Sequence, residues 1–154
     1  MRQRIKTYGS IEYRFWHYTK KTDTCWLFRS WIKNPRHHTF MYQGKRHLAH
    51  RYSYELHIGP IPQGYEVDHA CRVKNCVNPA HLRLALHAQN MQNQPPRKGS
   101  SDYRGVYWDK ARKMWTARGH KDYKGYFLGR FEREEEAGQG SLEWRLKNLP
   151  FTVE

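Results

Sequence analysis

Two cysteines and a histidine at intervals of five residues, Cys71, Cys76 and His81, constrain the fold of this chain more than any other feature. Zinc prefers four nitrogen or sulfur ligands in a tetrahedron, and these side chains supply three of them from one short segment. The chain has three cysteines, and because an odd number cannot all pair in disulfides, the spacing favours a metal. We expect Cys25 to be the fourth ligand of a structural zinc ion. The alternative interpretation is that the cysteines are small buried hydrophobic residues.

The length and composition of the chain explain why a metal would matter for folding. At 154 residues with 38% hydrophobic residues, the chain has room for one domain or two small ones, and a single large core is not expected. Small domains of this kind often need a metal or disulfides. No segment approaches the ~20 apolar residues of a membrane span, and the N-terminus leads into no apolar stretch. We therefore expect a soluble, intracellular protein of the cytoplasm.

The excess of basic residues predicts a polyanionic partner. The formal net charge is +14, and aromatic side chains are interleaved with the 28 lysines and arginines. The charge is uneven, because residues 1–98 hold 17 basic and 5 acidic residues (net +12), whereas residues 99–154 hold 11 and 9 (net +2). A basic surface can serve solubility alone, but here it surrounds the cysteine and histidine segment. We expect double-stranded DNA as the partner.

Short strands and helices alternate along the N-terminal part of the chain, which predicts an α+β fold. A hairpin with its turn at Gln43-Gly44 is the clearest of these elements. The expected elements are a strand at 25–28, the hairpin at 39–48, a helix at 49–57, strands at 65–67 and 82–86, and a short helix at 87–93.

A linker is expected at residues 95–100, Pro-Pro-Arg-Lys-Gly-Ser, because this composition has no apolar periodicity and disfavours regular structure. It would separate a domain at 1–94 from a domain at 101–154.

His69 and Asn90, on either side of the zinc-binding residues, suggest a hydrolytic site. Phosphodiester hydrolysis needs an activated water, a cation on the scissile phosphate and stabilisation of the leaving oxygen. His69 follows the expected strand at 65–67, and its imidazole is a suitable base near neutral pH. The oxygens of Asn90 and Asp68 are hard donors suited to Mg²⁺ or another divalent cation. A histidine beside an aspartate is more often a surface pair, and the neighbouring zinc spacing argues against that interpretation.

Five residues match a known spacing, because intervals of two, five, five and nine separate His69, Cys71, Cys76, His81 and Asn90. In this spacing the chain resembles the HNH, or His-metal finger, endonucleases, and most closely their His-Cys box branch of homing endonucleases. The segment 76–82 also looks like that of small phage HNH proteins, which makes a phage-infected cell a natural setting. The resemblance covers roughly residues 11–94. It implies a zinc-stapled ββα-metal nuclease core at about 65–94, with His69 as general base and Asn90 as ligand of the catalytic metal.

Two further roles are implied by the same resemblance. Asp68 matches the metal-binding aspartate of one HNH branch, whereas the His-Cys box branch lacks it. The family also uses an arginine to stabilise the leaving group. Arg51 is our candidate for that role, with Arg72 and Arg83 as alternatives.

The residues after 101 predict a small three-stranded antiparallel sheet packed on one helix. The helix has an acidic first turn, where the dipole favours carboxylates. The expected strands lie at 101–108, 114–120 and 125–131, and the helix at 132–147. The helical residues expected to face the sheet are Ala137, Leu142 and Leu146.

Strand alternation places Trp115 and Ala117 toward this helix and Thr116, Arg118 and His120 outward. An outer sheet face with arginine, histidine and aromatic side chains can lie in a DNA major groove. The alternative is a packing module with a solvated outer face.

The segments 103–106, 115–117 and 128–137 resemble the ethylene-response-factor (Apetala-type) DNA-binding domain. The resemblance implies a targeting module whose DNA face carries Arg104, Tyr107, Arg118, His120 and Phe127. The chain departs from the plant pattern, since Arg118 replaces an acidic residue and His120 an arginine. A sequence preference therefore does not transfer.

Together these features predict a metal-dependent DNA endonuclease of the HNH or homing type, targeted by its C-terminal sheet. It would contain structural Zn²⁺ and catalytic Mg²⁺ and act as a homodimer or a monomer. The alternative is a zinc-containing DNA-binding regulator without catalysis, and an RNA-binding module is a more distant third. The His69 and Asn90 pair separates the first two, because a regulator does not need it.

Overall fold

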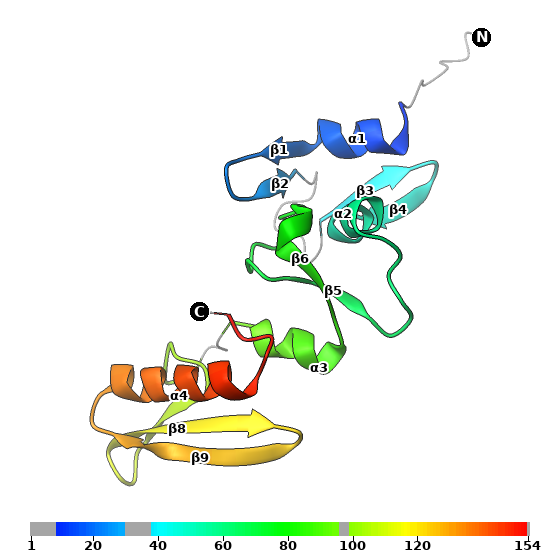
Figure 1. The fold of residues 1–154 in the computed structure, drawn as a ribbon. Helices are drawn as coiled ribbons and strands as arrows, with labels where there is room; N and C mark the ends of the chain where they lie inside the picture. Colours follow the sequence, from blue (N-terminus) through cyan, green and yellow to red (C-terminus); the bar gives the residue numbers. More distant parts are fainter. Residues whose placement is uncertain (1–8, 30–37, 96–98, 154) are drawn as a thin grey trace, which may run out of the picture. The chain divides into compact units, whose positions relative to one another are not determined.

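The computed structural model describes residues 9–29, 38–95 and 99–153. The chain divides into two compact units, Met1–His87 and Ala88–Glu154 (Figure 1). Residues 96–98 of the expected linker lie outside the described residues, so the linker stays a prediction. Within the described part of the chain, no helix combines the length and apolar character needed to cross a membrane.

The described residues of the N-terminal unit form three two-stranded antiparallel sheets, from the strand pairs β1-β2, β3-β4 and β5-β6. This mixture of small antiparallel sheets and short helices agrees with the expected α+β class. In chain order its elements are α1 (Ile11–His17), β1 (Thr19–Lys21), β2 (Trp26–Phe28), β3 (Thr39–Tyr42), β4 (Lys45–Leu48), α2 (Ala49–His57), β5 (Glu66–His69), the 3-10 helix η1 (Pro79–His81) and β6 (Leu82–Ala85). The boundary between the two units falls within α3 (His87–Asn90), after His87.

The β3-β4 hairpin and α2 confirm two predictions. Gln43 and Gly44 both have positive φ, 47° and 75°, which a two-residue hairpin turn of the favoured type requires. Strand β4 then leads directly into α2, whose bounds are those predicted.

Helix α1 is an element that the sequence did not predict. Ser10 caps it by accepting a hydrogen bond from the Tyr13 N–H at 3.1 Å, as polar N-cap residues do. The helix places Phe15 in a core with Phe28, Phe40 and other residues of this unit. This core explains how so polar a chain folds, because aromatic side chains bury a large apolar area each.

Strands β5 and β6 pair with Glu66 opposite Ala85 and His69 opposite Leu82. Val67 and Leu82 pack with Tyr54 of α2 in a second small core. The hairpin is thereby fixed against α2, and the end of β5 becomes a rigid support for His69.

The C-terminal unit is a three-stranded antiparallel sheet of order β7-β8-β9 with one helix on one face (Figure 1). Its core consists of Val106, Ala117 and Ala137, with Trp115 packed against it, so the predicted inward face of the second strand is confirmed. The elements are the 3-10 helix η2 (Met91–Asn93), β7 (Val106–Asp109), β8 (Met114–Lys121), β9 (Lys124–Phe131) and α4 (Glu134–Asn148).

Two details of this unit differ from expectation. Leu146 is 42% exposed, although it was expected to face the sheet. Helix α4 buries Ala137, as expected, together with Gly138 and Ser141. Thr116 is only 2% exposed, although alternation predicted it on an open face. Thr116 pairs with Tyr107 of β7 on one side and with Arg130 of β9 on the other.

Candidate functional site

Backbone hydrogen bonds bring Cys25 to the loop that carries the other cysteines. The Phe28 N–H donates to the Asn75 carbonyl at 2.8 Å, and the Val77 N–H donates to the Trp26 carbonyl at 2.7 Å. Leu27 and Cys76 form an isolated antiparallel bridge. The strand after Cys25 is thus joined to the loop between β5 and β6, a contact between segments far apart in the sequence.

Cys25, Cys71, Cys76 and His81 form one cluster whose ligand atoms all lie within 4.8 Å of one another. The His81 Nδ1 atom is 3.6 Å from the Cys25 sulfur and 3.5 Å from the Cys76 sulfur. A tetrahedral zinc ion separates a sulfur and a nitrogen ligand by about 3.6 Å. The donor set and its spacing therefore fit zinc, and the cluster could bind it.

Burial affects the protonation of the cysteines in this cluster. Burial raises the pKa of the Cys76 thiol to about 12 and also raises the pKa of the Cys71 thiol. A cation offsets this effect, because zinc ligation deprotonates a thiol. With four protein ligands no position is open to substrate, so the ion would be structural.

His69 lies at the end of β5, two residues before Cys71. The Ala70 N–H donates to the His81 carbonyl at 2.9 Å, which ties the backbone after His69 to a zinc-ligand residue. The His69 ring also lies against the His50 ring of α2, with centroids 4.9 Å apart. The sequence did not identify His50 as a neighbour, because residues of separate elements give no signal of contact in one sequence.

Asp68 and Arg83 form a cross-strand ion pair between β5 and β6. Arg83 Nε donates to Asp68 Oδ2 at 2.9 Å, and the Asp68 side chain is 5% exposed. The pair follows from the strand register, which sets the two residues opposite each other. The Arg83 side chain is therefore already bonded to Asp68, so Arg83 is a weaker candidate for the arginine that stabilises the leaving group.

Asn90 is the last residue of α3 and belongs to the C-terminal unit. At the other end of this helix, His87 lies 3.0 Å from a carboxylate oxygen of Glu66, both in the N-terminal unit. The expected order of strand, loop, strand and helix is thus present as β5, the cysteine loop, β6 and α3.

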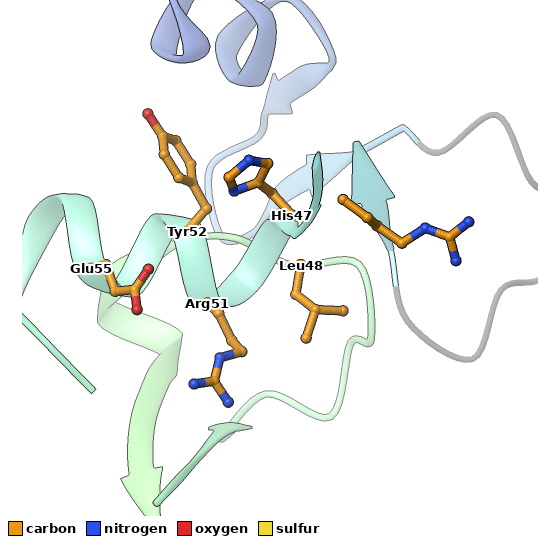
Figure 2. A pocket seen from close by; sticks show the side chains of 6 residues that line it. His47, Leu48, Arg51, Tyr52 and Glu55 are labelled. Atoms are coloured by element: carbon orange, nitrogen blue, oxygen red, sulfur yellow. The ribbon is translucent and has the colours of Figure 1, made fainter. Parts of the chain in front are cut away.

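Arg51 lines a pocket of about 210 Å³ beside the start of α2 (Figure 2). The same pocket contains Arg46, which the sequence did not single out. Arg72, the other candidate for the leaving group, lies in the turn after β5, where its N–H donates to the His69 carbonyl at 2.9 Å.

The outer face of the C-terminal sheet carries two arginines on aromatic rings. The Arg118 guanidinium lies 5.6 Å from the ring centroid of Tyr107, and that of Arg130 lies 5.0 Å from Phe127. His120 is exposed on the same strand as Arg118. Four of the five residues expected on the DNA face are therefore at the surface, and Arg130 joins them.

Arg104, the fifth, is placed differently from expectation. Its guanidinium donates to the carbonyl oxygens of Met91, Gln92 and Gln94 at 2.7 to 2.8 Å. These bonds engage the side chain with the segment that follows Asn90, and the expected DNA contact stays a prediction. Nothing local in the sequence indicates these hydrogen bonds.

Comparison with known proteins gives one family match. The family described as HNH endonuclease matches residues 47–92. These residues include His69, Asn90 and three members of the cysteine and histidine cluster, and they exclude Cys25. An HNH endonuclease domain match points to a nuclease or DNA-binding function.

Two phage proteins are similar to the chain. "Protein 3.8" of Escherichia phage T7 is 33% identical over 91 residues, which cover 57% of this chain and 64% of that protein. "Uncharacterized gene 5.3 protein" of Enterobacteria phage T3 is 49% identical over 39 residues, 25% of this chain and 39% of that protein. The chain thus spans less than two thirds of the length of either relative. No solved structure matches it.

Proposed function

We propose that this chain is a metal-dependent DNA endonuclease of the HNH type. The observation that carries the proposal is the match of residues 47–92 to HNH endonucleases. Its support in the structure is the placement of His69 on a rigid strand end, directly beside a cluster that fits zinc. The net charge of +14 suits a polyanionic substrate.

His69 is the proposed general base, which takes a proton from the attacking water. Strand β5 fixes its backbone, and the His50 ring limits its rotation on one side. A general base contributes about 10²- to 10⁴-fold to a rate when it is held in position. The zinc cluster serves this positioning, because it fastens the loop that begins two residues after His69.

Asn90 and Asp68 are the proposed holders of a Mg²⁺ ion. Such an ion would polarise the scissile phosphate and neutralise charge on the leaving oxygen. Arg83 orients the Asp68 carboxylate, as hydrogen-bonding partners of ligating carboxylates commonly do. Asn90 offers a neutral oxygen, which suits a cation that keeps most of its waters.

Arg51 is the proposed arginine for the leaving oxygen. It is half-buried in a pocket and forms no ion pair with any residue that the structure describes. Arg83, in contrast, is bonded to Asp68. A guanidinium without a carboxylate partner keeps its charge available for a phosphate.

The C-terminal sheet is the proposed targeting surface for double-stranded DNA. Tyr107, Arg118, His120 and Phe127 would contact the groove, and aromatic stacking would hold Arg118 in an extended orientation. Arginine is the side chain that most often reads guanine in the major groove. We leave Arg104 out of this surface because its guanidinium donates to the carbonyl oxygens of Met91, Gln92 and Gln94.

The test is conversion of supercoiled plasmid to nicked or linear DNA over a titration of Mg²⁺. The wild-type protein should cut only with a divalent cation, and Asn90→Ala should need a higher Mg²⁺ concentration. Its zinc content should not change. Tight DNA binding by the wild-type protein without cutting at any Mg²⁺, Mn²⁺ or Ni²⁺ concentration would instead favour a zinc-containing DNA-binding regulator.

A further inference from the structure

The pocket beside the start of α2 brings together two arginines from different elements. Arg46 comes from β4. Arg51 comes from α2 (Figure 2). Neither forms an ion pair with another residue in the described ranges. The two arginines give this pocket positive charge that no described carboxylate pairs with, which favours an anion.

The wall of this pocket is rigid. The Tyr52 ring packs against Phe15 and Phe40 of the main core, with centroids 5.1 and 5.4 Å apart. The His47 ring stacks on Phe40 at 5.3 Å. A ligand would therefore meet side chains that are already ordered, which reduces the entropic cost of binding.

The start of α2 adds to the positive potential of this pocket. It contributes the positive end of the helix dipole, and Leu48 at its N-cap supplies no side-chain hydrogen bond. The Tyr52 hydroxyl points away from the Arg51 guanidinium (Figure 2), so the groups that favour an anion are the two arginines and the helix start. These groups favour an anionic ligand rich in acceptor oxygens.

The charge of the lining selects among such ligands. Arg46 and Arg51 contribute +2 and Glu55 contributes −1, which leaves +1. A net positive lining favours an anion and disfavours a cation. The backbone of the proposed DNA substrate presents phosphodiesters, which are anions of this kind. Leu48 is the one aliphatic side chain of the lining, which disfavours an apolar ligand.

We propose that this pocket binds the phosphodiester backbone of DNA through Arg46 and Arg51. The inference rests on the proposed function, from which it takes DNA as the substrate. It adds Arg46 as a binding residue and fixes the path of the backbone across β4 and the start of α2. Arg46 would then hold the same phosphate that Arg51 contacts, or its neighbour.

Lys45 offers a matched control for Arg46. Both are exposed cations on β4, but consecutive strand residues point to opposite faces, and Lys45 does not line the pocket. Arg46→Gln and Lys45→Gln remove the same charge one residue apart. A difference in DNA affinity between these two variants is therefore due to the pocket and not to the overall charge.

The experiment measures the affinity of full-length His69→Ala protein for a labelled duplex by fluorescence anisotropy over a range of salt. Because nothing is cut in this background, failure of the proposed nuclease activity would leave the measurement valid. Arg46→Gln should weaken binding by roughly three- to tenfold and lower the salt slope by about 1. Lys45→Gln should change affinity less than about twofold. Equal effects of the two variants would overturn the proposal.

Two further measurements test whether the variants fold and whether the pocket binds free phosphate instead of DNA. Arg46→Lys keeps the charge and should restore part of the affinity, and thermal unfolding should give the wild-type midpoint for all three variants. Inorganic phosphate, at matched ionic strength, should displace DNA no better than chloride. Displacement by millimolar phosphate that Arg46→Gln abolishes would identify a free-anion pocket and overturn the assignment to DNA.

Discussion

The guanidinium of Arg104 donates a hydrogen bond to the carbonyl oxygen of Met91 at 2.7 Å. Two more bonds from the same group reach the carbonyls of Gln92 and Gln94, and the Gln92 side chain accepts one from the Phe151 N–H at 3.1 Å. The segment directly after Asn90 is therefore fastened to the C-terminal unit. On the proposed function, Arg104 therefore supports the segment next to a ligand of the catalytic metal.

Replacing Arg104 with alanine should release residues 91–94. Three charge-assisted hydrogen bonds are lost together, and each is typically stronger than a bond between neutral groups. Amide hydrogen exchange of 91–94 should accelerate while that of β8 stays slow. Cleavage should fall by about tenfold, as for loss of other groups that orient a metal ligand, at unchanged DNA affinity. Arg112→Ala, which removes an exposed arginine bonded to Asp109, is the control. It should change neither the hydrogen exchange of residues 91–94 nor the rate of cleavage.

Gly119 should not tolerate a side chain. A Cβ added there would lie 2.5 Å from the Trp144 ring, so strand and helix would have to separate. Gly119→Ala should lower the free energy of unfolding of the C-terminal unit by about 1–3 kcal/mol, measured by urea denaturation. The matched change Gly125→Ala meets only His120 at 3.5 Å and should cost far less. Equal costs would contradict the close packing of β8 on α4.

Elements whose local signals agree with their packing could be predicted from the sequence. The Gln43-Gly44 turn and α2 are of this kind, because turn chemistry and helical spacing act over few residues. The contact of Cys25 with the cluster of Cys71, Cys76 and His81 was also predicted, although these residues are far apart in the chain. The prediction was possible because tetrahedral zinc needs a fourth ligand. Chemistry thus specified a contact that periodicity alone could not.

The features that the sequence did not predict share a physical cause, which is packing between residues far apart in the chain. Helix α1 is short and is stabilised by burying Phe15, a tertiary effect that no local pattern shows. In α4, Gly138 lies under the Tyr103 ring, where a Cβ would come within 2.4 Å. A glycine that lowers helix propensity therefore allows an aromatic contact, and the buried face shifts away from Leu146.

The Asp68–Arg83 pair should show strong energetic coupling. Asp68→Asn and Arg83→Gln should each destabilise the N-terminal unit by about 1–3 kcal/mol, less than for a fully buried pair, because the Arg83 side chain is 30% exposed. The double variant should cost less than the sum of the two, since neither charge is then left alone. Chemical denaturation measures all four proteins. Additive costs would show that the pair contributes nothing specific.

Zinc removal should unfold the loop between β5 and β6. Cys76→Ser should reduce the zinc content from one ion per chain to well below one, and lower the melting temperature of the N-terminal unit, because ligation of structural zinc contributes directly to folding. The melting transition of the C-terminal unit should not change, which serves as the internal control. Metal analysis and calorimetry provide the readouts, and a zinc-free protein with wild-type stability would refute the cluster as a metal site.

The most direct measurement is single-turnover cleavage of supercoiled plasmid by His69→Ala protein with Mg²⁺ present. Loss of a general base should slow cleavage by about 10²- to 10⁴-fold, while zinc content and DNA affinity remain those of the wild type. His17→Ala, an exposed histidine on α1, should cut at the wild-type rate. Cleavage by His69→Ala at the same rate as His17→Ala would contradict the assignment of His69 as the base.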